Sequence, residues 1–264
     1  MSFMLETDLQ TIAFKKEKLV VKVIPDRDEM GLAAAEACAA TIKELLNVQD
    51  EVNMIFAAAP SQKEFLYHLC TDASIDWSRI NAFHMDEYVG LGPDHPQGFG
   101  FFLREHIFGK VNFRSVHYIN GVAADVEEEC RRYTTLLDLY PVDIVCMGIG
   151  ENGHIAFNDP GVADFNDPAM VKIARLDQIC RQQQVHDKCF YTIDDVPQQA
   201  FTLTVPALVR SKYHYCVVPT EHKAHAVYET LNGNISEHCP ASILRTCDHA
   251  ILYLDKGSAI YLDI

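Results

Sequence analysis

Short runs of apolar, often β-branched residues alternate with longer stretches of helical character from Leu19 to the end of the chain. The runs are apolar throughout, which is typical of strands that are buried on both faces. This rhythm predicts an α/β fold, a parallel sheet flanked by helices. The expected strands are residues 19–24, 53–58, 80–85, 115–119, 142–147, 213–218 and 250–254, and the expected helices are 28–46, 61–70, 98–108, 125–139 and 220–231.

The chain has the length of one domain. Its 264 residues, 48% of them apolar, can bury one sizeable core. We expect an N-terminal extension at residues 1–18 and a single domain at residues 19–264. Residues 159–196 are polar and interrupted by prolines, which predicts a lid or an irregular insertion.

Charge and cysteine content restrict the partners. A formal net charge of -15 argues against a duplex nucleic-acid partner, because neutralising phosphates requires a basic surface. Nine cysteines, an odd number without a C-x-x-C pair, favour a reducing cytoplasm. No stretch approaches the roughly 18 apolar residues of a membrane span, so we expect neither a membrane partner nor export. The sequence leaves a homo-oligomer open.

A glycine-rich segment follows the expected strand 142–147. Residues 148–153 read Gly-Ile-Gly-Glu-Asn-Gly, which satisfies the G-x-G-x-x-G pattern of dinucleotide-binding proteins. In that pattern the third glycine opens a helix that holds pyrophosphate, but Pro160 would end such a helix almost at once. We favour the alternative, in which Gly150 and Gly153 let the backbone approach a ligand at the carboxyl end of a strand.

His154 follows these glycines directly. An imidazole that titrates near neutrality can move a proton between a ring oxygen and solvent, and a carboxylate such as Asp159 could orient it. The alternative is a structural histidine in a tight turn. The glycine context favours the acid or base role.

Two carboxyl groups, Asp86 and Glu87, follow the expected strand 80–85. A carboxylate partly removed from water has a raised pKa, which suits a base that takes a proton next to a carbonyl. The alternative is that either side chain caps the next turn, which is the commoner case for a lone acid after a strand. The co-occurrence of Asp86 with His154 favours a catalytic role.

Two places could hold an anion. Residues 61–64, Ser-Gln-Lys-Glu, have the form of a capping box after a strand, and helix N-termini bind anions. Lys63 lies in that first turn and Lys223 in the first turn after Thr220, where a helix dipole disfavours a cation unless an anion is present. The alternative for each lysine is a solvated surface charge.

His222 and His225 could share a helix face and bind a metal. No H-E-x-x-H pattern and no third ligand accompany them, so a solvated pair is the favoured interpretation and no metal site is predicted.

Residues 83–88 (Phe-His-Met-Asp-Glu-Tyr) and 148–160 (Gly-Ile-Gly-Glu-Asn-Gly-His-Ile-Ala-Phe-Asn-Asp-Pro) resemble the two signatures of glucosamine-6-phosphate deaminases/isomerases. The resemblance extends more loosely over the chain after Leu19. It implies a doubly wound, mostly parallel sheet, shared with 6-phosphogluconolactonases, and a phosphorylated amino sugar as substrate. It also implies that no metal or organic cofactor is needed.

The resemblance also implies roles for single residues. Asp86 would move the C2 proton, and His154, with Asp159 as its partner, would help to open the sugar ring. Asn152 would complete the catalytic set. The residues expected to hold the substrate or its phosphate are Ser61, Gln62, Lys223, Arg181, Gly150 and Gly153.

Three departures from the family pattern stand out. The phosphate loop, rich in Gly and Thr in the family, reads Ala-Ala-Ala-Pro at residues 57–60. Asp159 stands where the family often has Glu. The Arg and Lys set that forms an allosteric site in some relatives is not recognisable after Asp159.

The sequence leaves three candidate functions. The first is an isomerising deaminase acting on glucosamine 6-phosphate or its galactosamine epimer. The second is a 6-phosphogluconolactonase, which would share the glycine-histidine turn without requiring residues 85–88. The third is a non-catalytic sugar-phosphate sensor, disfavoured because no basic helix-turn-helix segment is attached.

Overall fold

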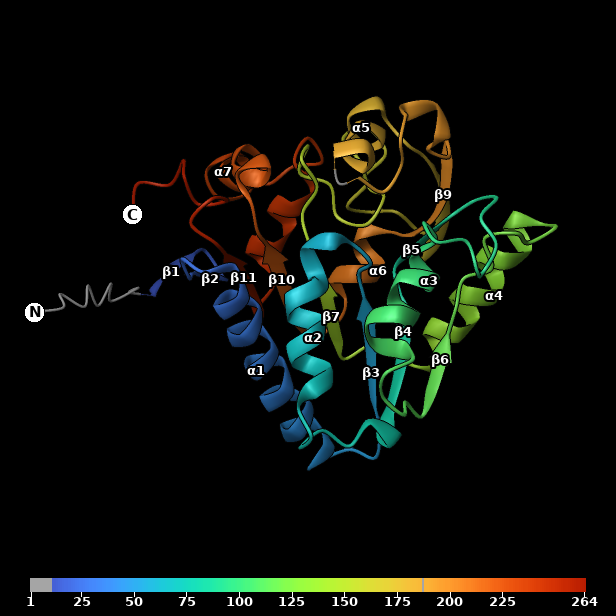
Figure 1. Ribbon diagram of the computed structural model, residues 1–264, viewed down its shortest axis with the longest axis horizontal. Coiled ribbons are helices and arrows are strands. Elements are labelled where there is room, and N and C mark those ends of the chain that lie inside the picture. Colours follow the sequence, from blue (N-terminus) through green and yellow to red (C-terminus); the bar gives the residue numbers. More distant parts are fainter. Residues whose placement is uncertain (1–10, 187) are drawn as a thin grey trace, which may run out of the picture.

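The computed structural model describes residues 11–186 and 188–264. Its centre is an eight-stranded sheet in the order β1-β2-β11-β10-β7-β3-β4-β6, in which every neighbouring pair is parallel except β1 and β2 (Figure 1). The strands of this sheet are β1 (Ile12–Lys16), β2 (Leu19–Val23), β3 (Val52–Phe56), β4 (Ile80–His84), β6 (Ser115–His117), β7 (Ile144–Met147), β10 (Tyr213–Val218) and β11 (Ala250–Leu254).

Helices cover both faces of this sheet, as the all-apolar strands require. Met54 and Phe56 of β3 pack into a core with α1 and α2, whereas Ile55 joins a second core on the opposite face with α4, α6 and α7. The helices are α1 (Arg27–Leu46), α2 (Lys63–Thr71), α3 (Phe99–Leu103), α4 (Val126–Leu139), α5 (Gln178–His186), α6 (Val205–Val209) and α7 (Ala224–Asn232). The prediction of a mostly parallel sheet flanked by helices is confirmed.

Local signals placed several elements well. β10 and β11 have the bounds expected from sequence, and Asp125 caps α4 by accepting the backbone N–H groups of Glu127 and Glu128. The expected helix 98–108 is α3 continued by a π-helical turn, η3 (Arg104–Phe108). The expected extension 1–18 is wrong in part, because β1 pairs with β2 as an edge strand of the sheet; residues 1–10 lie outside the described residues.

A second, antiparallel sheet lies beyond the carboxyl end of β4. Its strands are β5 (Asp86–Tyr88), β9 (Gln199–Leu203) and β8 (Val171–Arg175), in the order β5-β9-β8. Residues 159–196, expected to form a lid or an irregular insertion, also contain two regular elements, β8 and α5. These two elements were not predicted because β8 is only partly apolar and α5 is strongly polar, so neither carries a clear hydrophobic pattern.

Within the described ranges, no helix is both long and apolar enough to cross a membrane. All nine cysteines are free, and seven of them are buried. The carboxyl edge of the central sheet meets the second sheet and α5 (Figure 1).

Candidate active site

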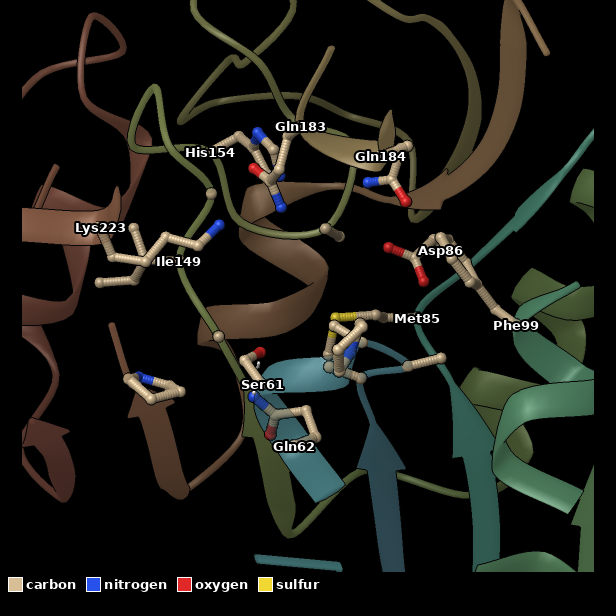
Figure 2. A pocket seen from close by; sticks show the side chains of 18 of the residues that line it. Ser61, Gln62, Met85, Asp86, Phe99, Ile149, His154, Gln183, Gln184 and Lys223 are labelled. Carbon is tan, nitrogen blue, oxygen red and sulfur yellow. Dashed lines mark hydrogen bonds between the residues drawn. The ribbon is translucent and has the colours of Figure 1, made fainter. Parts of the chain in front are cut away.

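A cleft lies at the carboxyl edge of the central sheet (Figure 2). Its floor comes from the loop after β3 and from the junction of β4 with β5, one side from the loop after β7, and another from the turn between β10 and α7. Helix α5 closes it from above. The lining residues are Arg27, Ala57, Ala58, Ala59, Pro60, Ser61, Gln62, Met85, Asp86, Phe99, Gly148, Ile149, Gly150, His154, Ala156, Phe157, Gln183, Gln184, Pro219, Thr220 and Lys223.

The glycine segment forms a turn and no helix. Gly150 donates its N–H to the His154 carbonyl (2.9 Å), and Gly153 turns the chain with a φ of +85°. A Cβ on Gly150 would lie 2.1 Å from His154 Cε1, so only glycine leaves room for the imidazole here. Gly153 does not line the cleft; a side chain there would meet Cys239. The preference against a dinucleotide site agrees with this turn.

His154 is held by two neighbours from its own loop. Its Nδ1 lies 2.9 Å from Asp159 Oδ1 and 2.7 Å from Asn152 Oδ1, and Asn152 donates in turn to Asp159 Oδ1 (3.1 Å). Asn152 and Asp159 therefore lie behind the imidazole, outside the cleft lining, and fix its orientation. The ring faces the cleft (Figure 2), where it can give or take a proton.

Asp159 is completely buried. Burial by itself would raise the pKa of its carboxyl group, but the hydrogen bond and charge of His154, with donors from Asn152 and the Asp177 backbone, hold that pKa below its usual value. The carboxylate thus stays charged and is suited to stabilise a protonated His154.

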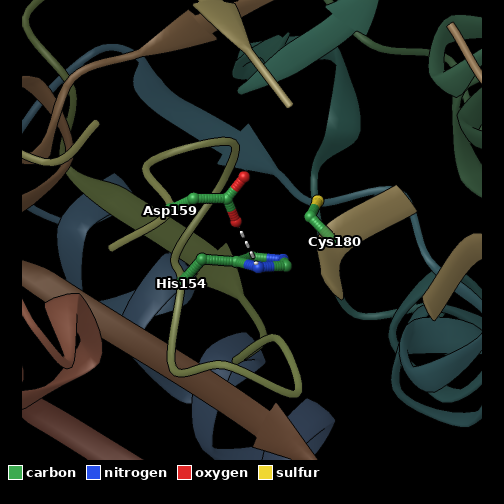
Figure 3. A group of neighbouring side chains, drawn as sticks. All are labelled: His154, Asp159 and Cys180. Carbon is green, nitrogen blue, oxygen red and sulfur yellow. Dashed lines mark ion pairs between the residues drawn. The ribbon is translucent and has the colours of Figure 1, made fainter. Parts of the chain in front are cut away.

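One group of the described residues could supply three metal ligands: His154, Asp159 and Cys180, whose ligand atoms lie within 4.8 Å of one another (Figure 3). The histidine and the carboxylate already form an ion pair. Burial, together with the charges of Asp159 and Asp177, raises the pKa of the Cys180 thiol, whereas a metal binds the thiolate. These contacts fit a hydrogen-bonded network. His222 and His225 do not belong to this group.

Asp86 lies across the cleft from His154, at the start of β5 (Figure 2). It is buried, and that burial, reinforced by the charge of neighbouring Glu87, raises the pKa of its carboxyl group well above the ordinary value. A carboxyl group in this condition is suited to take up and release a proton on carbon.

Glu87 has a structural position. Its carboxylate accepts the backbone N–H groups of Tyr88 (2.9 Å), Phe99 (3.0 Å) and Gly100 (2.8 Å), so it caps the start of α3. It does not line the cleft. Of the two carboxyl groups after β4, the capping interpretation thus fits Glu87, and Asp86 faces the cleft.

Ser61, Gln62 and Lys223 gather at the other end of the cleft (Figure 2). Gln62 donates to the Val217 carbonyl (3.1 Å) and to Ser61 Oγ (3.2 Å), which ties the loop after β3 to β10. The Lys223 side chain is buried, and its amine is directed into the cleft. A hydroxyl and a buried cation so placed are suited to bind an anion.

The structure differs from the expectations for this region in three respects. The capping box at residues 61–64 does not form, because no side chain caps α2 and Glu64 pairs instead with Arg27 (3.0 Å). Lys63 is exposed and lies outside the cleft lining. Arg181 also lies outside it; its guanidinium donates to the carbonyls of Ile193 and Val196 within the α5 region.

Sequence reasoning missed three residues that line the cleft. Arg27, at the start of α1, donates to the Pro60 carbonyl (2.9 Å) and so braces the loop after β3. Its position between β2 and α1, where a strand ends at the carboxyl edge of the sheet, could have indicated that it lines a site. Gln183 and Gln184 on α5 gave no such signal, because nothing in the sequence says that this helix folds back over the sheet.

A parallel sheet with a polar cleft at its carboxyl edge defines this protein as an α/β enzyme. The model of the family of glucosamine-6-phosphate isomerases/6-phosphogluconolactonase matches residues 25–253. The chain belongs to this family.

Individual relatives agree. A glucosamine-6-phosphate deaminase of Streptococcus pyogenes serotype M1 is 34% identical over 197 residues, 75% of this chain and 82% of the relative. One of Bacillus cereus (strain B4264) is 34% identical over 222 residues, 84% and 82% of the two chains.

Solved structures show the same fold. A monomeric glucosamine-6-phosphate deaminase superposes with a TM-score of 0.82 at 31% identity, covering 91% of this chain and 98% of the other. A 6-phosphogluconolactonase from Thermotoga maritima, with a TM-score of 0.75 at 20% identity and 90% and 100% coverage, shares the fold.

Proposed function

We propose that the protein converts glucosamine 6-phosphate, or its galactosamine epimer, to the ketose 6-phosphate and ammonia. The observation that carries this proposal is the placement of Asp86 and His154 on opposite sides of one cleft, with Lys223 and Ser61 at its far end. Relatives named glucosamine-6-phosphate deaminase, at 34% identity, support it.

The proposed reaction begins with ring opening. His154, oriented by Asp159, gives a proton to the ring oxygen as the bond between C1 and that oxygen breaks, and the C1 hydroxyl loses its proton to become the aldehyde oxygen. Asn152 keeps the imidazole in place by its contacts with both residues.

Asp86 then takes the proton from C2 and returns it to C1, while the C1 oxygen regains a proton and becomes a hydroxyl. This leaves an imine at C2. Water adds to the imine carbon, ammonia leaves, and the ketose remains. The raised pKa of Asp86 matches this task, because a base that must also give its proton back needs a pKa near the working pH.

Lys223 and Ser61 hold the phosphate in this proposal. Charge-assisted hydrogen bonds of this kind contribute about 1.5–3 kcal/mol each. Lys223→Ala should therefore raise KM by about tenfold or more. Lys63→Ala is the matched control, because Lys63 is exposed and outside the cleft; equal effects of the two changes would argue against this phosphate site.

Ammonia release tests the function directly. Pure protein is incubated with glucosamine 6-phosphate and with galactosamine 6-phosphate, and ammonia is measured. We expect release from at least one; no release from either would reject the deaminase proposal. Hydrolysis of 6-phosphogluconolactone that survives Asp86→Asn would identify a lactonase instead, and ligand-induced stabilisation without turnover would identify a sensor.

We also infer that the protein works in a reducing cytoplasm. The nine free cysteines, seven of them buried, support this. Fractionation of cells that express the protein would test it, and recovery outside the cytoplasmic fraction would reject it.

A further inference from the structure

Gln183 and Gln184 are consecutive residues of α5 that both line the cleft. The Oε1 atom of Gln183 accepts the backbone N–H of Glu151 (2.9 Å), so this side chain ties α5 to the loop that carries His154. Gln184 is directed differently, toward Asp86 (Figure 2). The two neighbouring glutamines therefore have different tasks.

Gln184 and Asp86 share an unusual condition. Their exposed fractions are only 8% and 7%, and neither side chain forms a hydrogen bond with any of the residues in the ranges 11–186 and 188–264. Both side chains line the cleft, and none of their polar atoms is among the fully enclosed side-chain atoms that lack a partner, so these atoms can be reached from the cleft. Two such groups facing the same end of one cleft indicate that a ligand supplies their partners.

Two apolar side chains also lie at this end of the cleft. Met85 and Phe99 lie beside Asp86 in Figure 2, and the Phe99 ring stacks on Phe157 with centroids 5.5 Å apart. A sugar hydroxyl placed here would meet hydrocarbon on these sides. Gln184 offers such a hydroxyl both a donor and an acceptor, which is what a hydroxyl group can satisfy.

The neutrality of Gln184 also matters. A lysine or arginine beside Asp86 would stabilise the carboxylate and lower its pKa, and a second carboxylate would raise that pKa further. An amide can form hydrogen bonds with a hydroxyl group without adding a charge that would change the pKa of Asp86. Gln184 can therefore bind a sugar hydroxyl without altering the basicity of Asp86.

We propose that Gln184 is a specificity-determining residue that hydrogen-bonds the C3 hydroxyl of the substrate. C3 is bonded to C2, the carbon at Asp86, so its hydroxyl is within reach of a side chain that is directed toward Asp86 (Figure 2). This inference rests on the proposed function, since it uses the same orientation of the sugar in the cleft.

The test compares glucosamine 6-phosphate with its 3-deoxy analogue. For each enzyme the ratio of kcat/KM for the two substrates is measured by ammonia release. We expect the native protein to prefer the 3-hydroxy substrate by about a hundredfold, since a site built to bond a hydroxyl rejects an analogue that lacks it. In Gln184→Met this preference should fall below about tenfold, mainly through slower turnover of the natural substrate.

Gln182→Met is the matched control, because Gln182 lies on the same helix outside the cleft lining and should keep the native preference. Because the ratio is taken on one preparation, loss of folded protein in a variant does not change it. An unchanged preference in Gln184→Met would overturn the inference while the native ammonia release upholds the proposed function. Absence of ammonia release by the native protein would instead reject the proposed function itself.

Discussion

Asp86 and Asp159 are both buried carboxyl groups beside one cleft, yet their pKa values are displaced in opposite directions. Burial and the charge of Glu87 raise the pKa of Asp86. Burial acts on Asp159 as well, but donors from His154, Asn152 and Asp177 outweigh it and lower the pKa.

Burial alone therefore does not determine the pKa of a carboxyl group. Asp159 is surrounded by hydrogen-bond donors and remains a fixed anion, whereas Asp86 has no such partners among the described residues and changes its protonation easily. One residue type thus supplies a stationary charge on one side of the cleft and an exchangeable proton on the other.

Among these changes, we expect Asp86→Asn to lower catalysis the most. The amide cannot take the C2 proton, so we expect kcat to fall by about 10³-fold or more with little change in KM. Steady-state ammonia release measures both constants. A variant that retains a tenth of the native kcat would remove Asp86 from the role of base.

Asp159→Asn should have the next largest effect. The amide removes the negative charge beside His154 and turns a donor toward neighbours that already donate, so the imidazole loses its orientation. We expect kcat to fall by about 10²-fold. Near-native kcat would show that His154 works without its partner.

Gly150→Ala should disturb His154 without touching either carboxyl group. The new Cβ would occupy the place of the imidazole and displace the ring. We expect kcat to fall by roughly thirtyfold, through misplaced proton transfer. Gly92→Ala is the control, because a Cβ at Gly92 meets nothing within 4 Å; equal activity of the two variants would contradict the packing argument.

The smallest expected effect is on the free energy of unfolding, to which Asp86 and Asp159 should contribute with opposite pH dependence. A raised pKa means that Asp86 loses its proton more readily in the unfolded chain, so its contribution to stability is present below about pH 4 and is lost as the pH rises through the folded value. A lowered pKa gives Asp159 the opposite sign: its contribution is present above about pH 4 and is lost as the pH falls.

At pH 7 we therefore expect Asp86→Asn to raise the free energy of unfolding by about 1 kcal/mol and Asp159→Asn to lower it by about 1 kcal/mol or more. Urea denaturation of the three proteins between pH 4 and pH 8 measures this. Shifts of the same sign would show that the two sites do not differ as described.

Much of the fold could be predicted because its signals are local. Mostly apolar runs marked seven of the eight strands of the central sheet, and Asp125 marked the start of α4. The second sheet could not be predicted, because β5 has three residues and pairs with a strand more than 100 positions later. Pairing over such a separation leaves no trace in a local pattern.

The part of the candidate site that could be predicted also depends on local signals. His154, Asn152 and Asp159 stand within one short segment, so a motif could unite them. Gln184 and Arg27 belong to distant helices that only the folded chain brings to the cleft.

Local sequence was enough to predict seven strands of the central sheet, five helices, the turn that presents His154 and the strand end that carries Asp86, because each depends on neighbours along the chain. Only the folded chain shows that Asp86 faces the cleft while Glu87 caps α3, that the pKa of Asp159 is lowered, and that Gln184 lines the cleft. The physical reason is that burial and hydrogen-bond partners, which set the pKa and reach of a side chain, come from residues far apart in sequence.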